Sequence, residues 1–282
     1  MISKIVALFI VLAGIIFTSA ALADPEKDFE NCKYGGPAPS AKAAVAACTR
    51  IINGGKEGGE RLSLAYTNRC EHDIGTKDQA IADCSRAIAL NPRSARAYQL
   101  RGDKYLNKEL LDRALADFTK SAELDPLSKE NGFVYYGLYY IHMKRGLYDA
   151  ALADMAMWAK TDPKDEDPYR FSAQIHEKFK RYDLALKDRT KAIEVMPDSP
   201  HVYADRADLY RKMDRLSDAL QDAEKAVKLR PDNGLFYECR ANVLVALGRR
   251  EEAIADYRKA LSFDNSNRGI KERLEKLGIS AN

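Results

Sequence analysis

A phrase of the form Ala-[Ile/Leu]-x-Asp recurs along most of this chain of 282 residues. Its aspartates follow one another at intervals of 34 residues, with a single interval of 37 between Asp117 and Asp154. The six aspartates are Asp83, Asp117, Asp154, Asp188, Asp222 and Asp256. A period of this length is typical of proteins built from stacked structural repeats, in which each unit buries its apolar face against its neighbours. The period therefore argues against a single globular core.

Each unit reads as two helices joined by a short turn. The first helix has a tyrosine near its start and a small residue, such as Gly102 or Ala173, four positions later. The second helix carries the Ala-Asp phrase and stops before a proline, which cannot continue a helix. Apolar residues recur at spacings of three and four, and no extended stretch alternates with period two. The sequence therefore predicts an all-α fold.

These features closely resemble the tetratricopeptide repeat family. The resemblance implies an α-solenoid of about six stacked helix-turn-helix units, at residues 61–94, 95–128, 132–165, 166–199, 200–233 and 234–267. Departures concentrate in the middle, where Tyr139 and Trp158 replace small residues and Arg189 replaces an aromatic residue. The third unit is therefore expected to pack with altered spacing.

The two ends of the chain differ from the repeats. Residues 1–23 resemble a secretory signal, with Lys4, an apolar run and the motif Ala21-Leu22-Ala23. Residues 24–60 are predicted to form a polar loop followed by the single helix of a half-repeat, because "AKAAVAAC" echoes the second helix of a unit. Residues 268–282 have one apolar and one charged face, which predicts a capping helix.

The leader predicts export to the periplasm, with secretion as the alternative. Its strongly apolar run is shorter than the roughly 20 residues that a spanning helix needs, so stable membrane insertion is not expected after cleavage. The formal net charge is +3, and acidic and basic residues are interspersed. That balance gives no electrostatic case for binding nucleic acid.

Four of the five cysteines lie in the first third of the chain: Cys32, Cys48, Cys70 and Cys84. An exported protein favours disulfides, and four cysteines allow three pairings. We favour Cys32 with Cys48 and Cys70 with Cys84, because Cys70 aligns with the close-approach residue Gly102 and Cys84 lies on the facing helix. A metal site that uses Cys70, His72 and Cys84 is disfavoured by the ligand spacing. Cys239 is left over, either as a partly buried thiol or as an intermolecular bridge.

Arginines recur on the first helices, at Arg69, Arg101, Arg206 and Arg240. They could form a row of anion-binding groups, but we favour pairs with the recurrent aspartates that fix the angle between helices. Two units lack the arginine and have Leu138 and Ser172 in its place. His142 and His176 stand where other units have tyrosine, which predicts a packing role.

In the tetratricopeptide repeat family the first helices line a concave groove. The resemblance places a partner-binding site here at Phe133, Tyr136, Tyr140, Met143, Arg170, Gln174, Asp208 and Arg211. The first four follow one face of a helix. Because this helix is apolar nearly all round, the alternative is that the stripe is buried. The lysine and asparagine pattern of members that grip the carboxyl terminus of heat-shock chaperones is absent.

No catalytic motif, phosphate loop or metal-ligand spacing stands out, so we expect neither an enzyme nor a cofactor. The sequence favours an exported scaffold that binds a protein or peptide in its groove. The alternative is a structural or self-associating envelope protein without a peptide ligand, in which Cys239 would link two copies.

Overall fold

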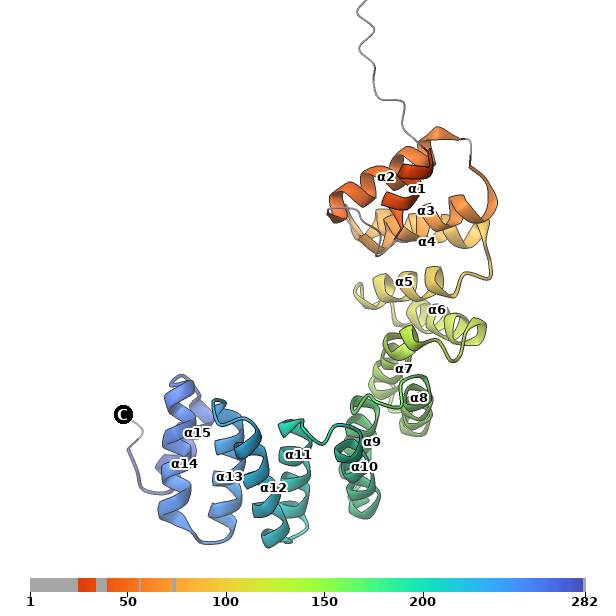
Figure 1. Ribbon diagram of the computed structural model, residues 1–282. Coiled ribbons are helices and arrows are strands. Elements are labelled where there is room, and N and C mark those ends of the chain that lie inside the picture. Colours follow the sequence, from red (N-terminus) through yellow and green to blue (C-terminus); the bar gives the residue numbers. More distant parts are fainter. Residues whose placement is uncertain (1–24, 34–39, 56, 73–74, 281–282) are drawn as a thin grey trace, which may run out of the picture. The chain divides into compact units, whose positions relative to one another are not determined.

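The computed structural model describes residues 25–33, 40–55, 57–72 and 75–280, and the predicted leader at 1–23 lies outside them. Over these residues the chain forms fifteen α-helices and one short 3-10 helix, with no strand (Figure 1). The expectation of an all-α solenoid is confirmed. None of the described helices is long and apolar enough to cross a bilayer. The chain divides into two compact units, residues 1–92 and 93–282.

The first unit contains four helices: α1 (Pro25–Cys32), α2 (Ala41–Gly54), α3 (Gly59–His72) and α4 (Lys77–Leu90). The expectation that residues 24–40 form only a loop is wrong for α1, which is helical and packs against α2. Phe29 on α1 contacts a small core that includes Ala47, Ile51 and Ala65. The half-repeat helix α2 is therefore covered by α1.

The second unit contains five consecutive helical hairpins and a final helix. The pairs are α5 (Ala95–Leu106) with α6 (Leu111–Leu124), α7 (Gly132–Lys144) with α8 (Tyr148–Thr161), α9 (Asp167–Lys178) with α10 (Tyr182–Val195), α11 (Pro200–Lys212) with α12 (Leu216–Leu229), and α13 (Gly234–Ala246) with α14 (Arg250–Phe263). Helix α15 (Arg268–Lys276) follows α14 (Figure 1). Its Ile270 and Leu274 are buried against residues of the last hairpin. We number the repeats from α3–α4 as repeat 1 to α13–α14 as repeat 6.

The repeated alanines explain why the two helices of a hairpin come close. The alanine that opens the phrase is fully buried in repeats 2 to 6, because a larger side chain would push the helices apart. The intervening turns share one backbone feature: a residue with positive φ recurs at Glu109, Gly146, Lys180, Asp214 and Gly248. Second helices end at residues with extended or related backbone that precede proline, such as Asp125 and Met196.

Repeat 3 accommodates its three additional residues in a 3-10 turn, η1 (Lys129–Asn131), immediately before α7. Tyr139 stands at the position of Gly102 and is buried. Gly137 lies at a close approach to the preceding repeat, where an added Cβ would be 2.5 Å from the ring of Phe118 on α6. Repeat 3 therefore differs from the other repeats in its 3-10 entry turn and in the buried bulk of Tyr139 and Trp158.

Candidate protein-binding groove

The aromatic stripe on α7 is its accessible face. Phe133 is 78% exposed, Tyr136 is also exposed, and Tyr140 and Met143 are half-buried. The remaining apolar residues of the helix are buried in the core of repeat 3: Val134, Tyr135, Leu138, Tyr139 and Ile141. The alternative of a buried stripe is wrong for Phe133 and Tyr136, whereas Tyr140 and Met143 pack partly against the core of repeat 3. Only about a fifth of the Phe133 surface is covered by the described residues.

A cluster of aromatic rings supports the stripe from below. The Tyr136 ring centroid lies 5.5 Å from that of Phe171 on α9 and 6.2 Å from that of Trp158 on α8. Tyr139 lies 5.2 Å from Phe171. Such ring pairs are favourable beyond the area that they bury, by about 0.5–1.5 kcal/mol each. The residues that depart from the repeat pattern thus form a rigid aromatic support between repeats 3 and 4.

Beyond the aromatic rings, a network of ion pairs joins the first helices of repeats 4 and 5. The Arg170 Nε of α9 donates to Asp205 Oδ2 of α11 over 2.9 Å. Arg189, on α10, bonds both Asp205 and Glu177 at 2.8 Å and is 5% exposed. Arg189 occupies an aromatic position of the repeat, so a guanidinium replaces a ring and bridges three helices.

The predicted groove residues Asp208 and Arg211 lie on α11 within the same network. Arg211 Nη2 is 2.6 Å from Asp208 Oδ1, and Lys212 Nζ is 2.6 Å from Asp208 Oδ2 and 2.8 Å from Glu177. Burial, the largest single influence, would raise the pKa of Asp208. The hydrogen bonds from Lys212 and Arg211 together outweigh it, and the pKa is lowered. This carboxyl group is therefore ionised at neutral pH.

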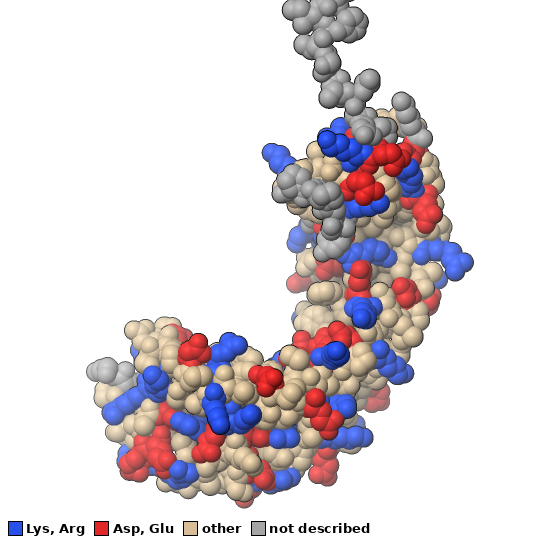
Figure 2. Space-filling view, viewed as in Figure 1, with Lys and Arg blue, Asp and Glu red and all other residues tan. Residues whose placement is uncertain are grey.

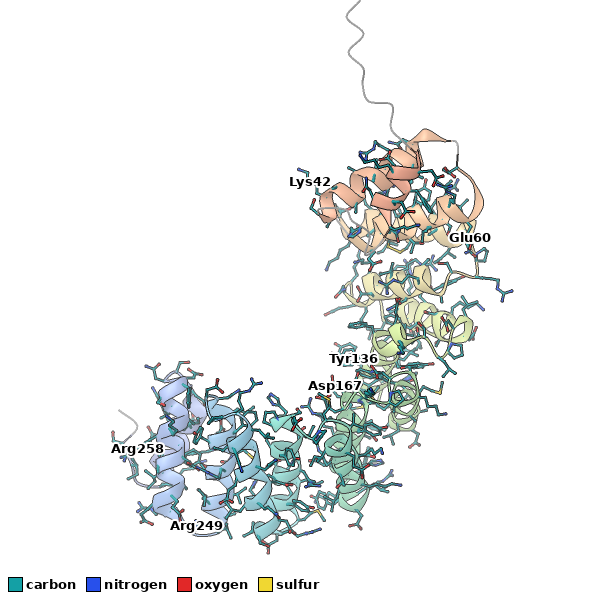
Figure 3. All side chains as sticks on the ribbon, in the orientation of Figure 1. Lys42, Glu60, Tyr136, Asp167, Arg249 and Arg258 are labelled. Carbon is teal, nitrogen blue, oxygen red and sulfur yellow. A yellow bond between two sulfur atoms is a disulfide. The ribbon has the colours of Figure 1, made fainter. Side chains whose placement is uncertain are left out.

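The structure thus separates the predicted site residues into two sets. Phe133, Tyr136, Tyr140 and Met143 form one continuous stripe, whereas Arg170, Asp208 and Arg211 are engaged in ion pairs and Gln174 is exposed. Tyr136 and Asp167, from α7 and α9, lie on the same side of the helices in Figure 3. Sequence reasoning missed Phe171, Asp205 and the bridging role of Arg189. The replacement of an aromatic residue by Arg189 was the one available signal.

The recurrent aspartates are structural. In repeats 1, 2, 5 and 6 the arginine forms two hydrogen bonds with the aspartate of the facing helix, at 2.7–3.0 Å: Arg69 with Asp83, Arg101 with Asp117, Arg206 with Asp222, and Arg240 with Asp256. The predicted inter-helix pairs are confirmed, and a row of anion-binding arginines is not available.

Repeats 3 and 4 satisfy the same aspartates differently. His142 Nδ1 lies 2.6 Å from Asp154, and the Ser172 hydroxyl donates to Asp188 over 2.6 Å, with His176 Nε2 at 3.7 Å. The two histidines therefore do more than pack. Burial raises the pKa of Asp154 to about 6, although the hydrogen bond with His142 opposes the rise.

The cysteines of the first unit form two disulfides, Cys32–Cys48 and Cys70–Cys84. These are the pairings that the sequence favoured. Among the described residues, no group of three or more histidine, cysteine or acidic side chains could hold a metal ion.

The remaining thiol is poorly suited to an intermolecular bridge. Cys239 is half-buried on α13 and donates to the Ala204 carbonyl over 3.6 Å. Loss of hydration raises its pKa to about 12, with a further contribution from nearby carboxylates. Because the thiolate is the reactive form, this residue is inert at neutral pH.

Comparison with known proteins agrees with this architecture. The family model described as "Tetratricopeptide repeat" matches residues 73–129 and 204–268. Human serine/threonine-protein phosphatase 5 is 38% identical over 90 residues, which cover 32% of this chain and 17% of the phosphatase. The rat protein matches over the same share. The chain thus spans about a sixth of the length of these curated relatives.

Two solved structures share the fold. YrrB, a tetratricopeptide repeat protein with an unusual peptide-binding site, superposes with a TM-score of 0.53 at 19% identity, over 68% of this chain and 97% of its own. A tetratricopeptide repeat protein from Parabacteroides merdae gives a TM-score of 0.53 at 20% identity, over 84% of this chain and 92% of its own.

Proposed function

We propose that this chain, which belongs to the tetratricopeptide repeat family, is an exported scaffold that holds a segment of a partner protein on the first helices of repeats 3 to 5. Proteins of this family serve as scaffolds for protein–protein interaction. The single observation that carries the proposal is the exposure of Phe133 at the start of an otherwise buried aromatic helix. Large exposed aromatic residues on a rigid support are typical of protein-binding surfaces.

The two sets of groove residues have different roles: the stripe contacts the partner, and the ion-paired residues fix the helices. The stripe of Phe133, Tyr136, Tyr140 and Met143 offers apolar contact area, and the ring pairs with Phe171 fix part of it in place before binding. A preorganised surface loses little side-chain entropy when a partner docks. The ion pairs of Arg170, Asp208 and Arg211 are already satisfied within the protein. We therefore assign them to holding α9 and α11 at a fixed separation, with Gln174 free to hydrogen-bond an extended partner backbone.

Export is supported by two features. The leader at 1–23 has the pattern of a secretory signal, and the two disulfides of the first unit require an oxidising compartment to persist. The periplasm satisfies both, with the extracellular medium as the alternative. We expect the mature protein to begin at Asp24. Intact mass of the exported protein, measured with and without reductant, tests both the cleavage site and the disulfides, and an uncleaved or fully reduced protein would contradict export.

Paired substitutions test the groove. Phe133→Ala combined with Tyr140→Ala removes the most exposed ring of the stripe together with a half-buried tyrosine at the edge of the repeat 3 core. We expect the far-ultraviolet circular dichroism to be unchanged, and the yield of partner cross-linked to the native exported protein to fall about tenfold or more. The matched control is Leu235→Ala, at the position in repeat 6 that corresponds to Phe133 and is 50% exposed. Equal yields from the double variant and the control would refute the groove assignment.

A further inference from the structure

The turns of repeats 3 and 4 carry a second distinctive surface, away from the α7 stripe. We call it the turn edge and define it by Leu147, Tyr148, Phe179, Arg181 and Leu184. These residues lie at the end of α9 and at the starts of α8 and α10. All of them belong to the second unit, whose helices are drawn in Figure 1.

In repeats 5 and 6 this part of the repeat holds an ion pair, which repeats 1 and 2 do not share because Thr76 and Leu110 precede their second helices. In repeats 5 and 6 the residue that precedes the second helix is an arginine, and it pairs with a carboxylate three positions later. Arg215 Nη2 lies 2.6 Å from Asp218 Oδ2, and Arg249 Nη2 lies 2.6 Å from Glu252 Oε2. Each turn therefore closes its own ion pair at the surface.

Repeat 4 has the arginine of this pair but not the carboxylate. Arg181 corresponds to Arg215, but Leu184 stands where Asp218 would be. No ion pair within 4 Å joins Arg181 to any carboxylate in the part of the chain that the structure describes, although Asp183 is two residues away and Asp149 lines the same cleft. In repeat 3 both positions are apolar or small, with Leu147 and Ala150.

The surroundings of Arg181 are apolar and exposed. Leu147, Phe179 and Leu184 are 49%, 42% and 46% exposed, an unusual concentration for one edge. The Arg181 guanidinium lies 5.4 Å from the Phe179 ring centroid, and the Lys178 ammonium lies 5.5 Å from that of Tyr148. The rings of Tyr148 and Phe179 meet edge to face at 4.7 Å. Aromatic faces therefore hold both cations in place.

A cleft of about 330 Å³ opens beside this cation. Its walls include Leu147, Leu152, Ile175 and Phe179, and Arg181 stands at its margin. The cleft is large enough for one or two apolar side chains. It lies at the junction of repeats 3 and 4, where Ile175 of α9 is fully buried below.

From this arrangement we propose that the turn edge binds a partner protein segment in which an acidic residue stands next to an apolar one. The partner's carboxylate takes the place that Asp218 and Glu252 occupy in the later repeats and pairs with Arg181. The adjacent apolar side chain enters the cleft between Leu147 and Phe179. Lys178 and Lys180, both exposed, add attraction for an acidic segment before contact.

An anionic membrane surface fits the turn edge less well. Asp149 and Asp183 lie among the cations, and they would oppose a continuous layer of negative headgroups. Figure 2 likewise shows acidic and basic residues intermixed on the face in view, without a broad block of one sign. One carboxylate beside one apolar side chain matches the edge in both charge and size.

A defined peptide tests this proposal without knowledge of the natural partner. The probe is a fluorescent, end-blocked peptide of sequence Gly-Asp-Leu-Phe-Gly, whose binding to the mature protein is measured by anisotropy. Its matched control has asparagine in place of aspartate. We expect the aspartate peptide to bind about threefold to fivefold more tightly, as a surface ion pair supports.

Variants of the protein locate the binding. Arg181→Gln should reduce the affinity to that of the asparagine peptide. Leu184→Asp supplies Arg181 with the internal partner found in repeat 5 and should have the same effect, whereas Leu184→Asn should change the affinity by less than about twofold. Arg215→Gln, at the corresponding site of repeat 5, should leave binding unchanged. All substituted residues are exposed, and circular dichroism verifies their folding.

Several results would overturn the proposal. Equal affinity of the two peptides, or binding insensitive to Leu184→Asp, would remove the role of Arg181. An equal loss in Arg215→Gln would show a general charge effect. Vesicles of phosphatidylglycerol and phosphatidylcholine that bind the protein through Arg181, when the peptide does not bind, would assign the edge to lipid. The stripe variant Phe133→Ala with Tyr140→Ala should retain peptide binding. If the peptide experiments refute binding at the turn edge, the proposed groove on α7 is therefore unaffected.

Discussion

The middle repeats, 3 and 4, differ from the last two, 5 and 6, in how their charged side chains are paired. All four contain the Ala-Asp phrase and consist of two helices joined by a short turn. In repeats 5 and 6 each recurrent aspartate is held by an arginine with two hydrogen bonds, and each turn closes an ion pair. In repeats 3 and 4 the aspartates are held by His142 and Ser172 instead, and Ala150 and Leu184 stand where repeats 5 and 6 have the turn carboxylates.

On our proposals, the difference separates residues that build the stack from residues that contact a partner. A permanent ion pair whose partners are both in the chain stabilises a hairpin and leaves little for another protein to bind. Repeats 3 and 4 leave aromatic rings and a cation exposed instead, on two different faces of the same hairpins. Departures from a repeat pattern are therefore where binding sites are best sought.

The largest expected difference between the two regions is the loss of stability when the partner of the recurrent aspartate is removed. Arg206→Ala leaves the buried Asp222 without its guanidinium and should destabilise repeat 5 by about 3 kcal/mol. His142→Ala should cost less in repeat 3, because Asp154 can take up a proton more readily. Native-state hydrogen exchange of the amides in α8 and α12 measures each repeat separately. A smaller loss of protection in α12 than in α8 would contradict this ranking.

Close packing gives the next largest effect. Gly137→Ala forces a methyl group against the Phe118 ring and should destabilise repeats 2 and 3 by about 1–3 kcal/mol. The control is Gly54→Ala at the end of α2, where an added Cβ meets nothing within 4 Å. It should be neutral or slightly stabilising. Urea unfolding followed by circular dichroism compares the two, and a neutral Gly137→Ala would show that the approach of α7 to α6 is not tight.

These examples indicate how far the sequence alone leads. The period of 34 residues was sufficient to predict the helix pairs, the buried alanines and the Arg–Asp pairs. Each of these features involves residues of one repeat only and recurs from repeat to repeat. Contacts between repeats are not encoded in the period. Phe171 supports Tyr136 from the next repeat, and Arg189 bridges Glu177 and Asp205 from two repeats. Helix α1 was missed because it is only eight residues long and polar, and stands beside glycines and prolines.

The pH dependence of stability should also distinguish the regions. The pKa of Asp154 is raised from its ordinary 3.8 to about 6, so the folded state binds this proton more tightly than the unfolded state does. The resulting stability is fully present below pH 3.8 and is lost as the pH rises through 6. Between pH 5 and pH 7 repeat 3 should therefore lose on the order of 1–2 kcal/mol.

A double substitution isolates this effect. Leu138→Arg with His142→Tyr gives repeat 3 the arginine and tyrosine that repeat 5 carries at Arg206 and Tyr210. An arginine stays charged throughout this range, so the difference in exchange protection of α8 between pH 5 and pH 7 should shrink in the variant. The same pH response in the wild-type protein and the variant would show that the His142–Asp154 pair is not its source.

The smallest expected effect lies in the turns. Lys180 adopts φ 55° where repeat 3 has Gly146 at φ 69°. Lys180→Gly should relieve backbone strain and stabilise repeat 4 by about 1 kcal/mol, and Gly146→Lys should destabilise repeat 3 by a similar amount. Thermal melts of the two variants should shift in opposite directions. Shifts of the same sign would indicate that side-chain contacts, and not the left-handed backbone, govern these positions.

Site-specific photo-crosslinking tests most directly whether repeats 3 and 4 form the binding region. A photoreactive phenylalanine derivative is placed at Phe133 in one protein and at Leu235, its counterpart in repeat 6, in another. Both are expressed with the leader in cells that export the protein. We predict a discrete adduct with a partner protein from position 133 and none from position 235. Adducts of equal yield from both positions, or from position 235 alone, would contradict the account.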